Sequence, residues 1–226
     1  MTIDSDYNDG VGSSVGTSFF IGDGCLCWPL GDGIDLAVSR KVHQLYRTLK
    51  ADPHMEGLSV TDVVPAYNAV AVYFDPAVAD IPGIRRRVDA VAGQSGNLDA
   101  PEGVETYRIP VVYDGEDLDR VARHSGLSVE GMILLHAGGD YTVAMIGFQP
   151  HFPYLIGLDD RLITPRLESP RTRIPAGTVA IGGAQTGIYP QESPGGWNLI
   201  GRTRPELLTV LKPGDRVRFE AVDRID

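Results

Sequence analysis

The chain is built around residues 147–203, GFQPHFPYLIGLDDRLITPRLESPRTRIPAGTVAIGGAQTGIYPQESPGGWNLIGRT. This stretch holds nine glycines and seven prolines in 57 residues, so turn-forming residues make up more than a quarter of it. Aromatic residues, arginines and short apolar runs such as TVAI separate the turns. Flexible linkers lack the aromatic and β-branched side chains that stabilise an ordered structure. The stretch therefore predicts a folded β surface, and we expect its loops to carry the function.

The charge of this stretch differs from that of the whole chain. The 226 residues carry a formal net charge of −10, which argues against nucleic acid as the main partner. Residues 147–204, in contrast, hold six arginines, no lysine and four acidic residues. Such local positive charge suits a site for an anionic small molecule or a partner surface. The alternative is that the arginines only bridge loop carbonyls.

The sequence also limits where the protein acts. No apolar run approaches the roughly 20 residues of a membrane-spanning helix, and the N-terminus has no signal-peptide pattern. We therefore expect a cytoplasmic protein that does not contact a membrane. Cys25 and Cys27 are too close for an unstrained disulfide, and no further cysteines are present to complete a zinc site. We interpret both as apolar filling residues in a reducing compartment, with no metal bound.

The first half of the chain alternates predicted strands and helices. Residues 1–16 show no periodicity and predict a disordered tail. Beyond them, the expected order β-α-β-β-α-β is that of a ferredoxin-like fold, in a domain over residues 17–103. The last strand either closes that sheet or begins the next domain. The expected elements are a strand or hairpin over 19–30, a helix over 35–50, strands over 55–64 and 67–74, a helix through Ile84, Val88 and Val91, and a strand over 104–113.

The second half, residues 104–226, is predicted to be mainly β and to form a barrel. Two short helices precede residues 147–203, with Ser128 as a candidate N-cap. A hairpin is expected to end this half, with the turn at 212–215. The expected elements are helices over 117–125 and 128–137 and strands over 141–148, 206–211 and 216–222.

Candidate chemical groups are few, because the chain lacks a Walker A loop, a G-x-S-x-G elbow and an H-E-x-x-H pair. His136 lies on an apolar helical face, which is more typical of a hydrogen-bonded core residue than of a catalytic one. Ser193 before Pro194 indicates a turn more than a nucleophile. The aromatic and polar residues of the stretch suit either a small-ligand pocket or simple packing of loops onto the barrel, and these alternatives stay open.

The motifs of the stretch resemble a known family. The patterns GFxPxFPYLxGL and TPRxxxPRTRxPAGxVAIxGxQTGIYPxxSPGGWxLIGRT are similar to the B subunit of 5-oxoprolinase, whose family is also named allophanate hydrolase subunit 1 and Kip-type inhibitor of a histidine kinase. The segments DVVPAYNAVAVYFDP and LKPGDRVRF fit as well, so the resemblance covers about residues 17–222. Two departures stand out. His151 replaces a glycine of the family pattern, and the connection over residues 204–210 is short.

The resemblance implies an α+β chain, with a ferredoxin-like domain followed by a cyclophilin-like β-barrel. It also implies a homologous barrel partner, named the 5-oxoprolinase C subunit or allophanate hydrolase subunit 2, and a third subunit. The complex would open 5-oxoproline to glutamate and consume ATP, whose site in this chain the motifs do not identify. The alternatives are a Kip-type kinase inhibitor and a carboxyltransferase or allophanate hydrolase subunit, as in urea carboxylase.

Within the resemblance, site roles are assigned as hypotheses. We expect Arg202 to contact an anion or carboxylate and His136 to serve as a reserve acid or base. The expected substrate-binding residues are Phe152, Tyr154, Gln185, Thr186, Tyr189 and Trp197.

Overall fold

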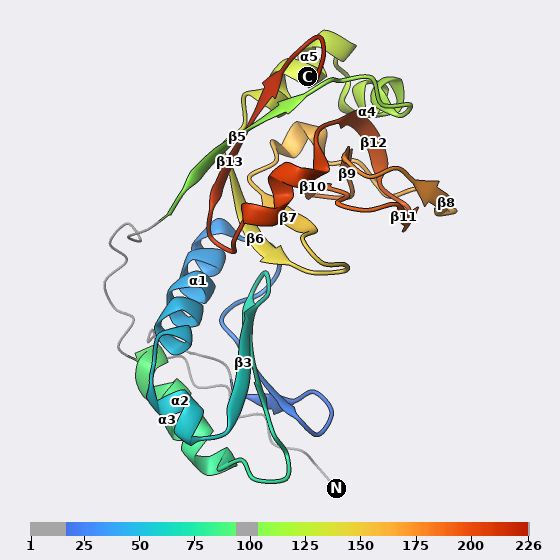
Figure 1. Ribbon diagram of the computed structural model, residues 1–226. Coiled ribbons are helices and arrows are strands. Elements are labelled where there is room, and N and C mark those ends of the chain that lie inside the picture. Colours follow the sequence, from blue (N-terminus) through green and yellow to red (C-terminus); the bar gives the residue numbers. More distant parts are fainter. Residues whose placement is uncertain (1–16, 94–103, 226) are drawn as a thin grey trace, which may run out of the picture.

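The computed structural model describes residues 17–93 and 104–225, which form two lobes (Figure 1). The first lobe is built on a four-stranded sheet with the order β1-β2-β4-β3. The second is built on a seven-stranded sheet with the order β12-β9-β10-β7-β6-β13-β5. Mixed α and β structure with a barrel-like second half is therefore confirmed. Among the described residues, none of the helices combines the length and the apolar character that crossing a bilayer requires.

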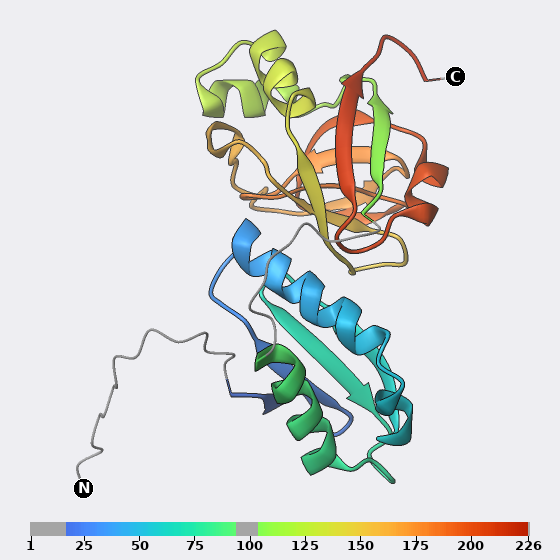
Figure 2. The same ribbon diagram turned by 90° about the vertical axis from the view of Figure 1, so that its left-hand side faces the viewer.

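The first lobe places two helices on one face of an antiparallel sheet (Figure 2). The apolar stripe of α1 faces the strands through the buried Val42, Leu45 and Leu49. The carboxylate of Asp35 accepts a hydrogen bond from the Val38 backbone N–H, which begins the helix. The bounds are β1 Phe19–Phe20, β2 Cys25–Pro29, α1 Leu36–Lys50, α2 His54–Gly57, β3 Val60–Pro65, β4 Ala69–Phe74 and α3 Ile81–Gly93.

One prediction for this lobe needs correction, and one open alternative is decided. Residues 55–57 were predicted as strand but belong to the short helix α2, because the Asp52 carboxylate accepts from the His54 N–H and the Met55 side chain is buried. The strand expected over 104–113 does not join this sheet. Its place beside β2 is taken by β1, so the β-α-β-β-α-β order is not completed within one sheet.

That strand, β5, begins the second lobe, where it pairs in parallel with β13. The two edge strands of the sheet then meet, because Val112 and Arg202 exchange backbone hydrogen bonds of 2.9 and 3.0 Å. This exchange brings the sheet close to a closed barrel. The barrel strands are β5 Thr106–Val111, β6 Tyr141–Ile146, β7 Pro153–Ile156, β9 Thr178–Ile181, β10 Thr186–Ile188, β12 Asn198–Arg202 and β13 Arg216–Ala221, and the strands β8 Arg171–Ile174 and β11 Ser193–Gly195 form a separate pair.

Two helices, α4 Leu118–Ser125 and α5 Val129–Ala137, pack at one end of the barrel (Figure 1). Gly126, with a φ of 68°, ends α4. The Ser128 hydroxyl accepts a 3.1 Å hydrogen bond from the Gly131 N–H, so the predicted N-cap is confirmed.

The strand predicted over 206–211 is wrong. These residues lie in the 3-10 helix η2, Pro205–Val210, whose buried Leu208 belongs to the barrel core. Pro205 has no N–H for a ladder bond, which favours a helical start. The turn at 212–215 therefore links a helix to β13. A second short 3-10 helix, η1, covers Asp160–Leu162.

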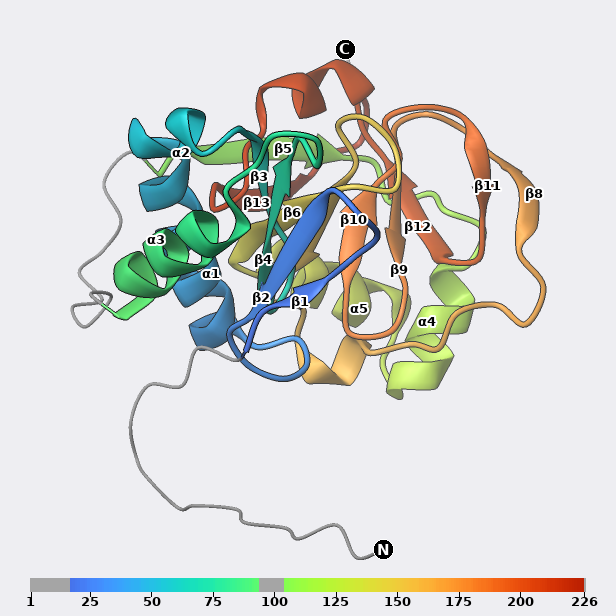
Figure 3. The same cartoon turned by 90° about the horizontal axis from the view of Figure 1, so that it is seen from below.

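Contacts between the lobes involve α1 and the tip of the β3–β4 hairpin (Figure 3). The buried ring of His43 on α1 lies with its Nε2 2.9 Å from the Ala144 carbonyl of β6. The ring of Tyr67, at the hairpin tip, packs edge-on against Tyr154 with centroids 5.9 Å apart. The free cysteines Cys25 and Cys27 are both buried in β2, and burial raises the pKa of each thiol.

Candidate functional site

An aromatic cluster lies at the barrel face next to the β3–β4 hairpin, and Phe152 is its centre. The Phe152 ring has centroid distances of 4.8 Å to Tyr154, 5.1 Å to Tyr189 and 5.7 Å to Trp197. Phe148 contacts it at 5.6 Å and is 62% exposed. Four of the predicted substrate-binding residues are thus brought together from separate parts of the stretch. The same contacts also pack the loops onto the barrel, as the alternative interpretation expected.

Glycines of the stretch make room for these rings. A Cβ atom at Gly182 would lie 2.5 Å from the Trp197 indole, and one at Gly195 would lie 2.4 Å from the Tyr189 hydroxyl. Neither glycine can be replaced without displacing a ring. The high glycine content therefore serves close approach of backbone and aromatic side chains.

Gln185, at the end of the β9–β10 turn, and Thr186, the first residue of β10, have different environments. Thr186 is buried, and its hydroxyl donates to the Ala180 carbonyl at 2.9 Å. The Gln185 side-chain oxygen is buried and has no hydrogen-bond partner among the described residues. Gln185 thus offers an unused polar atom, whereas the hydrogen-bonding capacity of Thr186 is used within the fold.

His136 lies inside the barrel core, with no exposed surface. Its Nε2 is 3.0 Å from the Thr186 hydroxyl, its Nδ1 is 2.8 Å from the Tyr113 hydroxyl, and its ring stacks on Phe219. Since the Thr186 hydroxyl already donates elsewhere, Nε2 carries the proton and Nδ1 accepts from Tyr113. Burial lowers the pKa of His136 to about 3, so the ring is neutral. These contacts match the core interpretation of this residue.

Arg202 lies at the far end of β12 from Trp197, a separation of roughly 16 Å for five residues of strand. Its side chain is exposed and forms a 2.7 Å ion pair with Asp114. The structure therefore does not bring Arg202 to the aromatic cluster.

Two residues of the cluster were missed in the sequence. The guanidinium of Arg166 lies over the Trp197 ring, 5.7 Å from its centroid. Tyr67 reaches the cluster from the other lobe through Tyr154. Both residues belong to the quoted family motifs: Arg166 is the arginine of TPR and Tyr67 is the tyrosine of AYN. Membership in these motifs could have identified them from the sequence. Ser193, considered as a nucleophile, lies on the β8–β11 pair with its hydroxyl buried and unpartnered among the described residues.

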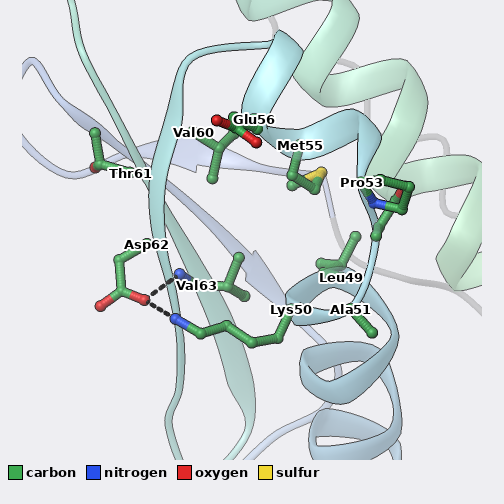
Figure 4. A pocket seen from close by; sticks show the side chains of 11 residues that line it. Leu49, Lys50, Ala51, Pro53, Met55, Glu56, Val60, Thr61, Asp62 and Val63 are labelled. Atoms are coloured by element: carbon green, nitrogen blue, oxygen red, sulfur yellow. Dashed lines mark hydrogen bonds and ion pairs between the residues drawn. The ribbon is translucent and has the colours of Figure 1, made fainter.

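A cavity of about 300 Å³ lies elsewhere, between α1, α2 and β3 (Figure 4). Its apolar lining includes Leu49, Met55 and Val63. The amine of Lys50 donates to the Asp62 carboxylate, which also accepts from the Val63 N–H at 2.8 Å. Because a carboxylate already neutralises Lys50, this cavity is a poor site for phosphate.

Comparison with known proteins identifies the family. Residues 17–212 match the carboxyltransferase domain, subdomain C and D. The chain is 35% identical to the 5-oxoprolinase B subunit of Bacillus subtilis, over 91% of this chain and 92% of the relative. It is 38% identical to the protein of the same name from Escherichia coli O157:H7, over 89% and 94%. The crystal structure of TTHA0988 is similar with a TM-score of 0.74 and 37% identity, and the match covers 88% of this chain and 40% of TTHA0988. The chain therefore belongs to the family of 5-oxoprolinase B subunits and carries that family's carboxyltransferase C and D region.

Proposed function

We propose that this chain is one subunit of an ATP-dependent 5-oxoprolinase, a cytoplasmic complex that opens 5-oxoproline to glutamate. The observation that carries the proposal is the identity of 35 and 38% to two 5-oxoprolinase B subunits, over about nine-tenths of both chains. The proposed partners are a homologous barrel protein, the 5-oxoprolinase C subunit or allophanate hydrolase subunit 2, and a third subunit. The first lobe, within residues 17–103, is proposed to be ferredoxin-like, and residues 104–226 to form a cyclophilin-like barrel.

The chemistry explains why ATP is needed. A lactam carbonyl is a poor electrophile, and phosphorylation of its oxygen would activate it toward water. The glycine-rich residues 182–187 do not fit a nucleotide site well. Gly182 and Gly183 lie in the tight β9–β10 turn, in which the Gly182 N–H donates to the Gln185 carbonyl, and residues 182–187 contain no lysine. We therefore place ATP binding in another subunit and expect this chain to contribute to substrate binding.

The proposed roles differ in how directly the geometry supports them. Phe152, Tyr154, Tyr189 and Trp197 form one packed cluster, in which only Tyr154 is half-buried and the other three rings are buried. A small ring would therefore pack on Tyr154, and the buried oxygen of Gln185 would become a polar contact only if the loops moved. Thr186 would act only by fixing neighbouring groups. Arg202 would bind an anion only after leaving Asp114, and His136 would exchange protons with substrate only if the barrel end opened.

Reconstitution tests the function. This chain is purified with and without the proteins of its neighbouring genes, and ATP-dependent glutamate formation from 5-oxoproline is measured. We expect glutamate only from the full assembly. Absence of glutamate from the full assembly would refute the proposed function, and glutamate from this chain alone would refute the requirement for partners.

The family match favours a second candidate, carboxyl transfer, because the matched region is named a carboxyltransferase domain. Such an activity needs a carboxylated biotin as donor. An assembly that is inactive with ATP and 5-oxoproline, but transfers a carboxyl group from a biotin carrier, would establish this alternative instead.

A further inference from the structure

Arg166 differs from the other arginines of residues 147–203. Each of four neighbours has a carboxylate partner, in the pairs Arg161–Asp159, Arg171–Glu116, Arg173–Glu192 and Arg202–Asp114. The guanidinium of Arg166 faces the Trp197 ring and has no ion pair among the described residues. A guanidinium on an aromatic face keeps its N–H groups free for a planar acceptor such as a carboxylate.

Hydroxyl donors stand beside this cation. The Tyr67 hydroxyl is buried and has no hydrogen-bond partner among the described residues. Burial raises the pKa of Tyr67 and of Tyr154, so both phenols keep their protons at neutral pH. A buried hydroxyl without a partner is costly, and a ligand oxygen would satisfy it.

Both lobes are needed to bring these groups together. Tyr67 comes from the tip of the β3–β4 hairpin, whereas Tyr154, Arg166 and Trp197 come from the barrel (Figure 3). The charge of Arg166 opposes the rise in pKa that burial causes in Tyr67 and in Tyr154. The half-buried Tyr154 ring, beside a cation without an ion pair among the described residues and a hydroxyl donor, is suited to a small, flat molecule that carries a carboxylate.

We propose that Arg166 and Tyr67 bind the carboxylate of the substrate while its ring packs on the half-buried ring of Tyr154. This inference rests on the proposed function, since 5-oxoproline has a carboxylate next to a nearly planar lactam ring. It gives the carboxylate contact to Arg166, where the sequence favoured Arg202.

Calorimetric titration of the full chain tests the site. The probes are 5-oxoproline and 2-pyrrolidinone, the same lactam without the carboxylate. We expect Arg166→Gln to weaken 5-oxoproline binding about tenfold or more, the effect of one charged hydrogen bond, and to leave 2-pyrrolidinone binding unchanged. Tyr67→Phe is expected to weaken 5-oxoproline binding several-fold. The matched control is Arg173→Gln, an exposed arginine of the same stretch paired with Glu192, which should bind as the wild type does.

In the reconstituted assembly, Arg166→Gln should raise the KM for 5-oxoproline about tenfold. An unchanged KM, or equal 5-oxoproline affinity of the wild type and Arg166→Gln, would overturn the inference. If the assembly makes no glutamate, the proposed function fails but the site is still decided by calorimetry with benzoate and pyruvate as probes. Binding lost in Arg166→Gln then supports a carboxylate site, and no binding to the wild type overturns it.

Discussion

The β6–β7 loop contains two non-glycine residues in the left-handed region, Phe148 with φ 68° and His151 with φ 66°. Side chains other than glycine rarely adopt this conformation, because Cβ approaches the neighbouring carbonyl. The family pattern has glycine at the position of His151, and the backbone angle supplies the reason. The sequence revealed the departure, but only the structure relates it to a conformational cost.

His151→Gly is therefore expected to stabilise the protein by about 1 kcal/mol, since it removes a left-handed penalty at an exposed position. The free energy of unfolding is measured by urea denaturation. The matched control is His124→Gly, in the exposed part of helix α4, which should destabilise by about 1 kcal/mol. A destabilised His151→Gly variant would show that the imidazole makes a compensating contact.

Among the helices and strands, the sequence pattern predicted those features that depend on neighbouring residues, such as an apolar stripe or a helix cap. The stripe Val42, Leu45 and Leu49 defined α1, and Ser128 defined the start of α5. The predictions that failed concern segments whose structure depends on contacts with residues far away in the chain. The strand at 104–113 was found, but nothing in its own residues says that its neighbour is β13, far along the chain. Residues 206–211 are apolar enough for a strand, yet Pro205 and the burial of Leu208 favour a 3-10 turn.

Helix α5 is attached to the barrel by neutral His136, which makes the attachment sensitive to acid. The pKa of His136 is about 3 in the folded state and near 6.5 unfolded, so the unfolded chain binds the extra proton as pH falls. Stability is thus fully present above about pH 6.5 and declines below it, by about 2 kcal/mol at pH 5 from this group. Burial also lowers the pKa of His43, so this residue adds to the loss of stability at low pH.

Urea denaturation at pH 7.5 and at pH 5 measures this effect. His136→Gln should be less stable than the wild type at pH 7.5 but should lose about 2 kcal/mol less between the two values. Equal pH dependence of the two proteins would contradict a buried neutral histidine. The same variant bears on its proposed reserve role: activity retained by the folded variant would remove His136 from the chemistry.

At the scale of the whole molecule, the candidate site was only half visible in the sequence. The ring residues of 147–203 were expected to line a pocket or to pack the loops, and Phe152, Tyr154, Tyr189 and Trp197 form one cluster in which only Tyr154 is half-buried. Tyr67 lies much earlier in the chain, and its contact with Tyr154 depends on how the lobes pack. The ion-pair partner of Arg202 could not be predicted for the same reason, because Asp114 lies 88 residues away in the chain.

The contact between the lobes can be tested through His43, which meets the Ala144 carbonyl at 2.9 Å. His43→Ala leaves that buried carbonyl without its partner, at a cost of about 1–3 kcal/mol, and should loosen α1 from the barrel. We expect the calorimetric melting curve to separate into two transitions, where the wild type shows one. His124→Ala, exposed on α4, is the control and should keep a single transition. One unshifted transition for His43→Ala would mean that the lobes are coupled mainly elsewhere.

The position of β13 between β6 and β5 has a consequence for synthesis on the ribosome. The first lobe needs only residues up to Gly93, so its sheet and helices can form while the rest is still being translated. The barrel cannot close in the same way, because its first strand pairs with residues 216–221. Until residues 216–221 leave the exit tunnel, β13 is missing from its place between β5 and β6, and the backbone edges that it covers on both strands stay unpaired. The half-made barrel is therefore the stage at which a chaperone, or the proposed partner protein, finds the largest unpaired strand edge to bind.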